Sequence, residues 1–264
     1  MNGRRSLAIA AALALAGPAA AGPPPAVSGL MKKTEAAHPT ALWHVVHDLC
    51  VMDMQTLGNP APCLAVDLQG GHAVVKDLAD TTQLLLVPTR RVTGIESPLL
   101  QAPDSPNYWQ AAWAARALFA RQAGVRLERD EVMLAVNSVW ARTQNQLHVH
   151  IECIRPDVRA ALKAHADQLR ARWSPFPVPL NGARFRARWV AGEDLRGADP
   201  FRLLADGERR ARGHMGRMNL AVVGSRKGRA PGFILLSHMD RGPGPRAIAA
   251  ESLTDHACAV LRER

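Results

Sequence analysis

Two histidines, His148 and His150, stand two residues apart in a short apolar segment of this chain. In a β-strand alternate side chains face the same side, so the two imidazoles are predicted to share one face, about 7 Å apart. A neutral imidazole, with an ordinary pKa of about 6.5, is a good nucleophile toward phosphorus near neutral pH. A second imidazole beside it can donate a hydrogen bond to a phosphoryl oxygen. The pair therefore predicts either phosphoryl chemistry or a metal site.

Polar and basic residues elsewhere in the chain are candidates to hold a phosphorylated substrate. The hydroxyl of Thr143 and the amide of Asn137 can orient phosphoryl oxygens without a metal. Four basic side chains are candidates to hold a pyrophosphate, although a solvated surface charge is the alternative for each: Lys76, Arg90, Arg142 and Arg155.

A zinc site is the alternative use of the same two histidines. Zinc needs at least one more protein ligand, and none of the candidates stands at a recognisable spacing: His44, His47, Glu152, His214 and His238. The chain has no Cys-x-x-Cys motif of the kind that makes a thiolate zinc knuckle or a redox site. We therefore expect no metal and no cofactor. His214, which lies between two nearby glycines, is expected to be a surface or packing residue.

The composition is that of a folded globular protein with an excess of basic residues. Hydrophobic residues make up 47% of the 264 residues, charged residues make up 21%, and the formal net charge is +10. This length allows one large domain or two small ones. A nucleic-acid partner is not expected, because the arginines are scattered and aromatic residues are only 5%. An anionic lipid surface, a pyrophosphate substrate or an arginine-rich composition alone explains the charge as well.

The first 22 residues have the pattern of an export signal. A pair of arginines is followed by an apolar stretch over residues 7–16 and by small residues that offer a cleavage site before Gly22. The apolar run is shorter than the ~20 residues that a spanning helix needs, so we expect cleavage first and an uncleaved N-terminal anchor second. Residues 23–37, which begin with a proline- and glycine-rich stretch, are predicted to be a linker.

Export would place the four cysteines in an oxidising compartment, where disulfides form. Cys50 and Cys63 flank a loop that is rich in Gly, Asn and Pro, which suits a local bridge. Cys153 would then pair with Cys258 and tie the histidine segment to the C-terminal end of the chain.

Hydrophobic spacing and turn residues predict a mixture of helices and strands. Helices are expected over residues 42–51, from a start at 104–106 to Gly124, and from Pro156 onward. Strands are expected at the histidine segment and over residues 73–76, 83–88, 132–137, 220–223 and 233–236. Because there is no regular βαβ alternation, the pattern favours an α+β fold.

Several segments of the chain resemble CDP-diacylglycerol pyrophosphatases, which are exported bacterial enzymes with a histidine-triad-like fold. The specific matches are Cys-Ile-Arg-Pro-Asp from Cys153 and Glu-Ser-Pro-Leu-Leu from Glu96. The resemblance covers most of the chain after about residue 42, and its further stretches lie at 76–78, 86–89, 134–138, 142–145, 148–151, 200–201 and 214–217.

The resemblance implies roles for the residues around the histidine pair. In the His-x-His-x-His pattern of the wider family the middle histidine is the nucleophile, which implies that role for His148 and a helper role for His150. The first position is Gln146, whose amide can form hydrogen bonds but cannot ionise. Thr143 matches the phosphate-binding hydroxyl of the family, and Asn137 matches its upstream amide.

The fold that the resemblance implies is a histidine-triad (HIT)-like α+β domain over residues 38–264, with an antiparallel sheet and flanking helices. Residues 176–264 would form a C-terminal extension or the second half of this domain. If the substrate is a lipid, Trp109 and Trp113 could contact its acyl chains, although their helical spacing is more typical of core residues.

The activity that the resemblance implies is hydrolysis of CDP-diacylglycerol to CMP and phosphatidate through a cytidylyl-histidine intermediate. The enzyme would work on the periplasmic side of the inner membrane, against an anionic membrane surface, and analogy with histidine-triad proteins indicates a homodimer. One alternative is a histidine-triad hydrolase or transferase of soluble nucleotide pyrophosphates. The other is a non-catalytic nucleotide- or lipid-binding protein.

Overall fold

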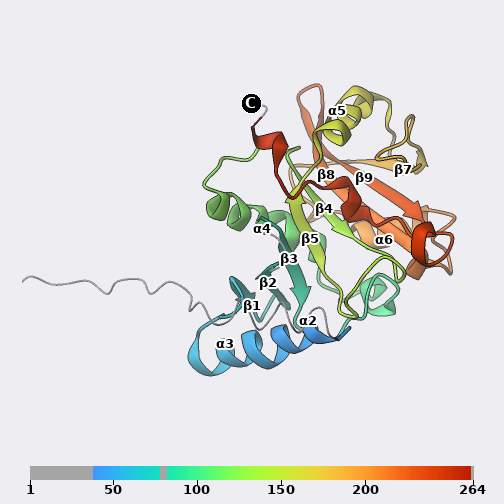
Figure 1. Ribbon diagram of the computed structural model, residues 1–264. Coiled ribbons are helices and arrows are strands. Elements are labelled where there is room, and N and C mark those ends of the chain that lie inside the picture. Colours follow the sequence, from blue (N-terminus) through green and yellow to red (C-terminus); the bar gives the residue numbers. More distant parts are fainter. Residues whose placement is uncertain (1–37, 78–81, 263–264) are drawn as a thin grey trace, which may run out of the picture.

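The computed structural model describes residues 38–77 and 82–262. The expected export signal and linker, and most of the turn at residues 77–80, lie outside these ranges. The strands of the described residues form one antiparallel sheet in the order β1-β2-β3-β5-β4-β8-β9-β7-β6 (Figure 1). They are β1 (Ala65–Asp67), β2 (His72–Lys76), β3 (Leu84–Pro88), β4 (Val132–Val136), β5 (Val149–Cys153), β6 (Ser174–Pro175), β7 (Arg186–Ala191), β8 (Met218–Lys227) and β9 (Ala230–Met239).

Three helical segments run on without a break and are called here the N-terminal helix: α2 (Ala41–His44), the π-helical η1 (Val45–Val51) and α3 (Met52–Leu57). The other α-helices are α4 (Tyr108–Ala123), α5 (Pro156–His165) and α6 (Pro200–Gly207). Short 3₁₀ turns are η2 (Pro98–Gln101), η3 (Ala166–Gln168), η4 (Met215–Arg217), η5 (Gly244–Arg246), η6 (Ala250–Leu253) and η7 (Ala259–Leu261). This mixture of helices with an antiparallel sheet confirms the α+β class. None of the helices in the described ranges combines the length and the hydropathy of a membrane span.

Most of the predicted elements are confirmed, but two helix boundaries are wrong. The N-terminal helix runs on to Leu57, beyond the predicted end at residue 51. The strands expected at 73–76, 83–88 and 132–137 correspond to β2, β3 and β4. The sequence predicts that α4 starts at residues 104–106, but the helix begins at Tyr108. The reason is that the side chain of Asn107 accepts a hydrogen bond from the backbone N–H of Gln110 at 3.0 Å and so caps the helix there. Helix α4 ends at Gly124, as predicted.

Different helices cover the two faces of the sheet. Alternate side chains of β3 point to opposite faces. Leu85 and Val87 pack in one hydrophobic cluster with the N-terminal helix, whereas Leu84 and Leu86 pack in the cluster that contains α4. Figure 1 shows the N-terminal helix (blue) beside β1 and β2 and α4 (green) on the other side of these strands. The whole of β3 is buried, as its apolar run predicts.

The tryptophans of α4 belong mainly to the core. Trp109 is fully buried, and its ring lies 5.2 Å from that of Phe201. Trp113 meets Phe233 edge to face at 4.8 Å, and the guanidinium of Arg116 lies 3.5 Å from its ring centroid. Contact with an acyl chain is therefore not the role of Trp109, and the interpretation as core holds.

The C-terminal part of the chain is joined closely to the histidine strand. Strand β8, which comes from this part, pairs directly with β4. The disulfide Cys153–Cys258 links the end of β5 to the last turn, and the disulfide Cys50–Cys63 fastens the N-terminal helix to the loop that follows it. These are the two pairings that the sequence favours. The segment that carries η6 contacts β4 and β8, and Figure 1 shows it (red) crossing the sheet there.

Candidate active site

The histidine pair lies on the face of the sheet against which the N-terminal helix also packs. Strand β5 pairs with β3 and β4, so that His150 stands between Leu85 and Ala135. His148 lies one position before β5. The two rings meet edge to face, with centroids 4.8 Å apart and planes at 71°. The prediction that the two imidazoles share one face is confirmed.

His148 turns one ring nitrogen toward the backbone and leaves the other available. Its Nδ1 lies 2.8 Å from the backbone carbonyl of Gln146, and because a carbonyl can only accept, Nδ1 carries the proton. Nε2 of the neutral ring therefore keeps its lone pair. Burial lowers the pKa of His148 to about 4, and the charges of His150 and Arg142 act in the same direction. With this pKa the ring is neutral near pH 7, and 8% of the residue is exposed to solvent.

His150 has a hydrogen-bonding partner at each ring nitrogen. Its Nε2 lies 2.9 Å from Oε2 of Glu251, and its Nδ1 lies 2.8 Å from the amide nitrogen of Gln83. Burial opposes the charged form of this ring, but Glu251 outweighs burial, and the pKa of His150 is raised. The two neighbouring imidazoles thus have pKa values that are shifted in opposite directions. Opposite pKa shifts suit a pair in which one ring acts as the nucleophile and the other donates a proton.

Glu251 and Asn137 complete the group around the two rings. The backbone N–H of Glu251 donates to the side-chain oxygen of Asn137 at 3.3 Å. The amide nitrogen of Asn137 lies 3.5 Å from Nε2 of His150 and donates to the carboxylate of Glu251. Burial alone raises the pKa of Glu251, but the charge and hydrogen bond of His150 lower it to about 2. His150 and Asn137, which are predicted to donate to phosphoryl oxygens, therefore donate to the carboxylate of Glu251 in this structure.

A second carboxylate lies behind His150. Glu152, two residues further along β5, is fully buried on the same face of the sheet. Its oxygens accept hydrogen bonds from the amide nitrogen of Gln83 at 3.1 Å and from Nδ1 of His256 at 2.9 Å. Gln83 therefore bridges a buried carboxylate and the ring that assists His148.

A buried polar network fixes the loop between β4 and β5. The hydroxyl of Ser138 and the amide of Asn219 both donate to the carboxylate of Asp240, and all three residues are fully buried. The other oxygen of Asp240 accepts the backbone N–H of Ile248 at 2.8 Å. The network therefore joins the loop that leads to the histidines to the segment that supplies Glu251.

Gln146, predicted to contact phosphate, is used within the protein. Its amide nitrogen donates to the carbonyls of Pro88 and Arg90, and its oxygen accepts the backbone N–H of Val92. Both of its N–H hydrogens are thus engaged, and the side chain fastens the loop after β3. The contribution of Gln146 to the site is its backbone carbonyl, which fixes the ring of His148.

Arg142 and Thr143 do not contact the histidines through hydrogen bonds either. Arg142 forms a two-pronged ion pair with Glu96, at 2.6 and 2.8 Å, and only 7% of its side chain is exposed. It acts on the site through its charge, which contributes to the lowered pKa of His148. Thr143 is exposed on the same loop.

The register of the sheet does not bring Lys76 to the histidines. Lys76 stands opposite Leu84, and Leu84 stands opposite Ile151. Because Ile151 and His150 are neighbours in a strand, they face opposite sides. Lys76 therefore belongs to the face that α4 covers, and its predicted contact with phosphate is not supported. Arg155, a further candidate, pairs with Asp157 at the surface.

The side chains considered as a third zinc ligand are dispersed. His44 and His47 both pair with Asp48 on the exposed side of the N-terminal helix, and His214 is exposed. In residues 38–77 and 82–262, no three His, Cys, Asp or Glu side chains lie together as a metal ion would require.

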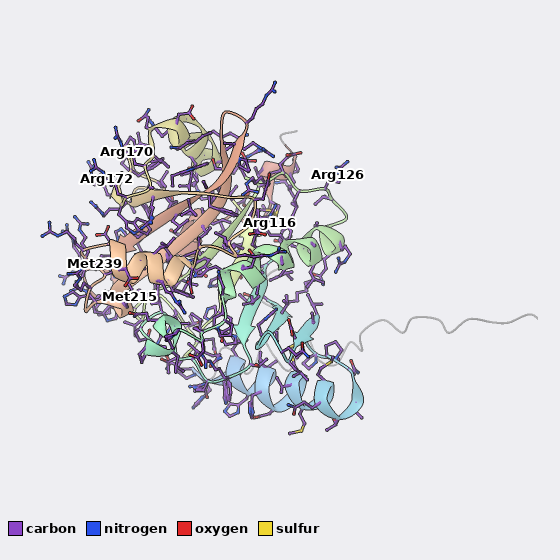
Figure 2. All side chains as sticks on the ribbon, turned by 180° about the vertical axis from the view of Figure 1, so that it is seen from behind. Arg116, Arg126, Arg170, Arg172, Met215 and Met239 are labelled. Atoms are coloured by element: carbon purple, nitrogen blue, oxygen red, sulfur yellow. A yellow bond between two sulfur atoms is a disulfide. The ribbon has the colours of Figure 1, made fainter. Side chains whose placement is uncertain are left out.

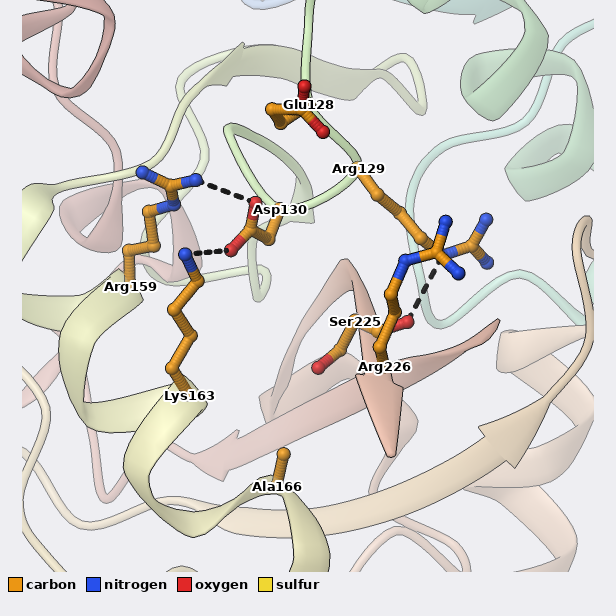
Figure 3. A pocket seen from close by; sticks show the side chains of 8 residues that line it. All are labelled: Glu128, Arg129, Asp130, Arg159, Lys163, Ala166, Ser225 and Arg226. Atoms are coloured by element: carbon orange, nitrogen blue, oxygen red, sulfur yellow. Dashed lines mark hydrogen bonds and ion pairs between the residues drawn. The ribbon is translucent and has the colours of Figure 1, made fainter. Parts of the chain in front are cut away.

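A basic cavity of about 310 Å³ is a competing candidate site, at the opposite end of β4 from Asn137. Figure 3 shows that three of its cations, Arg129, Arg159 and Lys163, turn toward groups of the protein itself. Arg159 and Lys163 both reach Asp130, at 2.8 and 3.0 Å, and Arg129 donates to several backbone carbonyls. Since these charges are used within the fold, the histidine pair is the better candidate for chemistry.

The remaining positive charge is spread over the surface. Figure 2 shows Arg126 on one side of the molecule and Arg170 and Arg172 on the other, and all three are exposed. This agrees with the scattered arginines of the sequence.

Sequence reasoning misses Glu251 and Gln83, and it considers Glu152 only as a metal ligand. Glu251 lies far from the histidine motif in the sequence, and the one signal that brings its segment to the site is the expected Cys153–Cys258 bridge. Gln83 lies two residues before Leu85, so its place beside β5 follows only when the strand order is known.

Comparison with known proteins identifies relatives over almost the whole described chain. The model of the family described as CDP-diacylglycerol pyrophosphatase matches residues 37–262. A CDP-diacylglycerol pyrophosphatase of Yersinia pestis is 38% identical over 234 residues, which cover 89% of this chain and 90% of that protein. The family match includes both the histidine segment and Glu251.

Proposed function

This chain belongs to the CDP-diacylglycerol pyrophosphatase family, and from that premise we propose that His148 is the nucleophile that opens the pyrophosphate bond of CDP-diacylglycerol. The enzyme is a hydrolase of a phosphoric anhydride, and its products are CMP and phosphatidate. The observation that carries the assignment is the state of His148. The Gln146 carbonyl holds its proton on Nδ1, and its lowered pKa keeps Nε2 unprotonated.

In the first step Nε2 of His148 attacks the phosphorus that is linked to cytidine. The bond from this phosphorus to the bridging oxygen breaks, and phosphatidate leaves with the electron pair. A phosphate monoester is a good leaving group, so little acid catalysis is needed. His150 and Asn137 donate to the phosphoryl oxygens, and the substrate takes the place that the carboxylate of Glu251 occupies between them.

In the second step water attacks the phosphorus of the cytidylyl-histidine intermediate. The bond between phosphorus and Nε2 breaks, its electron pair returns to His148, and CMP leaves. Glu251, whose side chain is 35% exposed, is displaced by the phosphoryl group from its place beside His150, and in its displaced position next to that group it receives the proton of the water. Another alcohol or phosphate could replace water, which would make the enzyme a transferase.

We also infer a histidine-triad-like fold and a place at the membrane. An antiparallel strand that carries His-x-His, with Gln146 in the first position, supports the fold. Two disulfides fit an exported protein, and a net charge of +10 favours an anionic inner-membrane surface on the periplasmic side, at about 1 kcal/mol per nearby basic residue.

The lowered pKa of His148 gives the reaction a characteristic pH dependence. Attack on phosphorus needs the neutral ring, which predominates above the pKa. Because the pKa falls from 6.5 to about 4, we expect kcat/KM to be lost only as the pH drops through about 4. A pH–rate profile between about pH 3 and pH 8 measures this limb. If kcat/KM were instead lost near pH 6.5, the ordinary pKa of histidine, this would contradict the proposal that the nucleophile is a buried histidine that stays neutral.

The function is tested by incubating the protein with CDP-diacylglycerol in detergent micelles that contain a metal chelator. We expect CMP and phosphatidate in equal amounts. CDP-alcohols and dinucleoside polyphosphates are assayed in parallel, and a faster reaction with them would favour an enzyme of soluble nucleotides. Tight binding without turnover would favour a binding protein, and loss of activity in chelator would favour zinc.

A further inference from the structure

Gln83 lies between the buried carboxylate of Glu152 and the ring of His150. We propose that Gln83, held by Glu152, fixes the proton of His150 on Nε2, where it faces the phosphoryl site. The catalytic consequence of this arrangement rests on the proposed function. Gln83 is a positioning residue, because it acts through His150.

Glu152 determines the geometry because its environment is that of an ionised carboxylate. Two N–H donors reach its oxygens, the Gln83 amide at 3.1 Å and Nδ1 of His256 at 2.9 Å. The hydroxyls of Thr254 and Thr82 lie 3.1 and 3.3 Å away, and each shares its single hydrogen between Glu152 and a backbone carbonyl. Glu152 is fully buried, and a buried charge is tolerated when hydrogen bonds of this kind satisfy it. An ionised carboxylate can only accept hydrogen bonds.

The orientation of the Gln83 side chain follows from this carboxylate. If the carbonyl oxygen of Gln83 faced Glu152, two acceptors would be in repulsive contact, so the NH₂ group faces Glu152. The same nitrogen lies 2.8 Å from Nδ1 of His150, and its second hydrogen is available for this contact. In the neutral form of the ring, Nδ1 of His150 therefore accepts and carries no proton. The raised pKa of His150 concerns the charged form, in which both nitrogens are protonated.

The other nitrogen of the ring leads to the same assignment independently. Oε2 of Glu251 lies 2.9 Å from Nε2 of His150, and two acceptors would not approach so closely without a hydrogen between them. The proton therefore lies on Nε2. If Gln83 were absent, the neutral ring could carry its proton on Nδ1, and a lone pair on Nε2 would then face the phosphoryl oxygens.

The two side chains can be exchanged to test this assignment. In the exchange variant, Gln83→Glu/Glu152→Gln, net charge and nearly all of the volume are kept, and a hydrogen bond can still join the two positions. The carboxylate now faces Nδ1 of His150 and holds a proton there, and in the neutral ring Nε2 then has none. We expect kcat for CDP-diacylglycerol to fall by about 100-fold or more with KM nearly unchanged, since a wrong tautomer costs far more than a lost contact. The melting temperature should stay close to that of the wild type.

Glu152→Gln alone is the matched conservative variant. The new amide can still turn its oxygen toward Gln83 and preserve the orientation, so the loss of kcat should stay within about tenfold. If the exchange variant does not fold, Gln83→Met, which removes the donor and keeps the length, is measured in its place. Full kcat in the folded exchange variant, or in Gln83→Met, would overturn the proposal.

The tautomer itself is read from ¹⁵N spectra of histidine-labelled wild-type protein without substrate, at a pH above the raised pKa of His150 so that this ring is neutral. We expect His150 to be protonated on Nε2 and His148 on Nδ1, and a proton on Nδ1 of His150 would refute the role of Gln83. This readout is independent of the reaction. Failure of the wild type to cleave CDP-diacylglycerol would remove the proposed function while leaving the tautomer assignment intact.

Discussion

Replacing His148 with alanine is expected to lower kcat/KM for CDP-diacylglycerol by at least about 10⁴-fold. The variant has no atom at the position of Nε2, so water would have to attack the phosphorus directly. The remaining donors, His150 and Asn137, still bind phosphoryl oxygens, and KM should therefore change less than kcat. Steady-state measurement of CMP release gives both constants.

The matched control for this variant is His44→Ala. His44 is also a histidine, but its side chain is exposed on the N-terminal helix and pairs with the exposed Asp48. This variant should keep wild-type kcat/KM. If His148→Ala retained substantial activity while remaining folded, the nucleophile would have to be another group.

Removing the disulfide between Cys153 and Cys258 is expected to destabilise the protein by about 4–5 kcal/mol and to reduce activity. The bridge closes a loop with a sequence separation of 105 residues, so its loss increases the freedom of the unfolded chain strongly. It also holds the segment that carries Glu251 and Thr254 against β5, where Asp255 donates its backbone N–H to the carbonyl of Cys153. Denaturant titration of Cys153→Ala/Cys258→Ala, followed by the CMP assay, measures both effects.

The Cys50–Cys63 disulfide supplies the control for this experiment. Its sequence separation is only 13 residues, so loop-closure entropy predicts that its removal costs about 2 kcal/mol less. This bridge lies beside the N-terminal helix and away from Glu251, and Cys50→Ala/Cys63→Ala should keep more of the activity. Equal losses in the two double variants would show that the C-terminal bridge has no special connection to the site.

Local patterns in the sequence predict six of the nine described strands and the histidine pair, because these features depend on neighbouring residues. The strands β1, β6 and β7 are not predicted. The apolar run of β3 is buried throughout, and the alternation of His148 and His150 does place both rings on one face. The cysteine pairing follows from a short loop and from elimination among four thiols.

The assignments that the structure does not support, and the residues that sequence reasoning misses, depend on strand order and on partners far away in the sequence. Lys76 begins one of the stretches that resemble the family, but the register of β2 places its side chain on the face of the sheet opposite the histidines. Gln146 occupies the first position of the triad pattern, but its side-chain amide forms hydrogen bonds with the backbone of the loop after β3. Glu251 reaches His150 from a segment near the C-terminus, and no local pattern marks it.

The stereochemical course at the cytidine-linked phosphorus tests the double displacement most directly. A substrate with one chiral phosphorothioate at this phosphorus is hydrolysed in ¹⁸O-labelled water, and the configuration of the thio-CMP is determined. Each in-line displacement inverts the phosphorus, so attack by His148 followed by attack by water predicts net retention. Net inversion would mean that water attacks the substrate in a single step, and it would contradict His148 as the nucleophile.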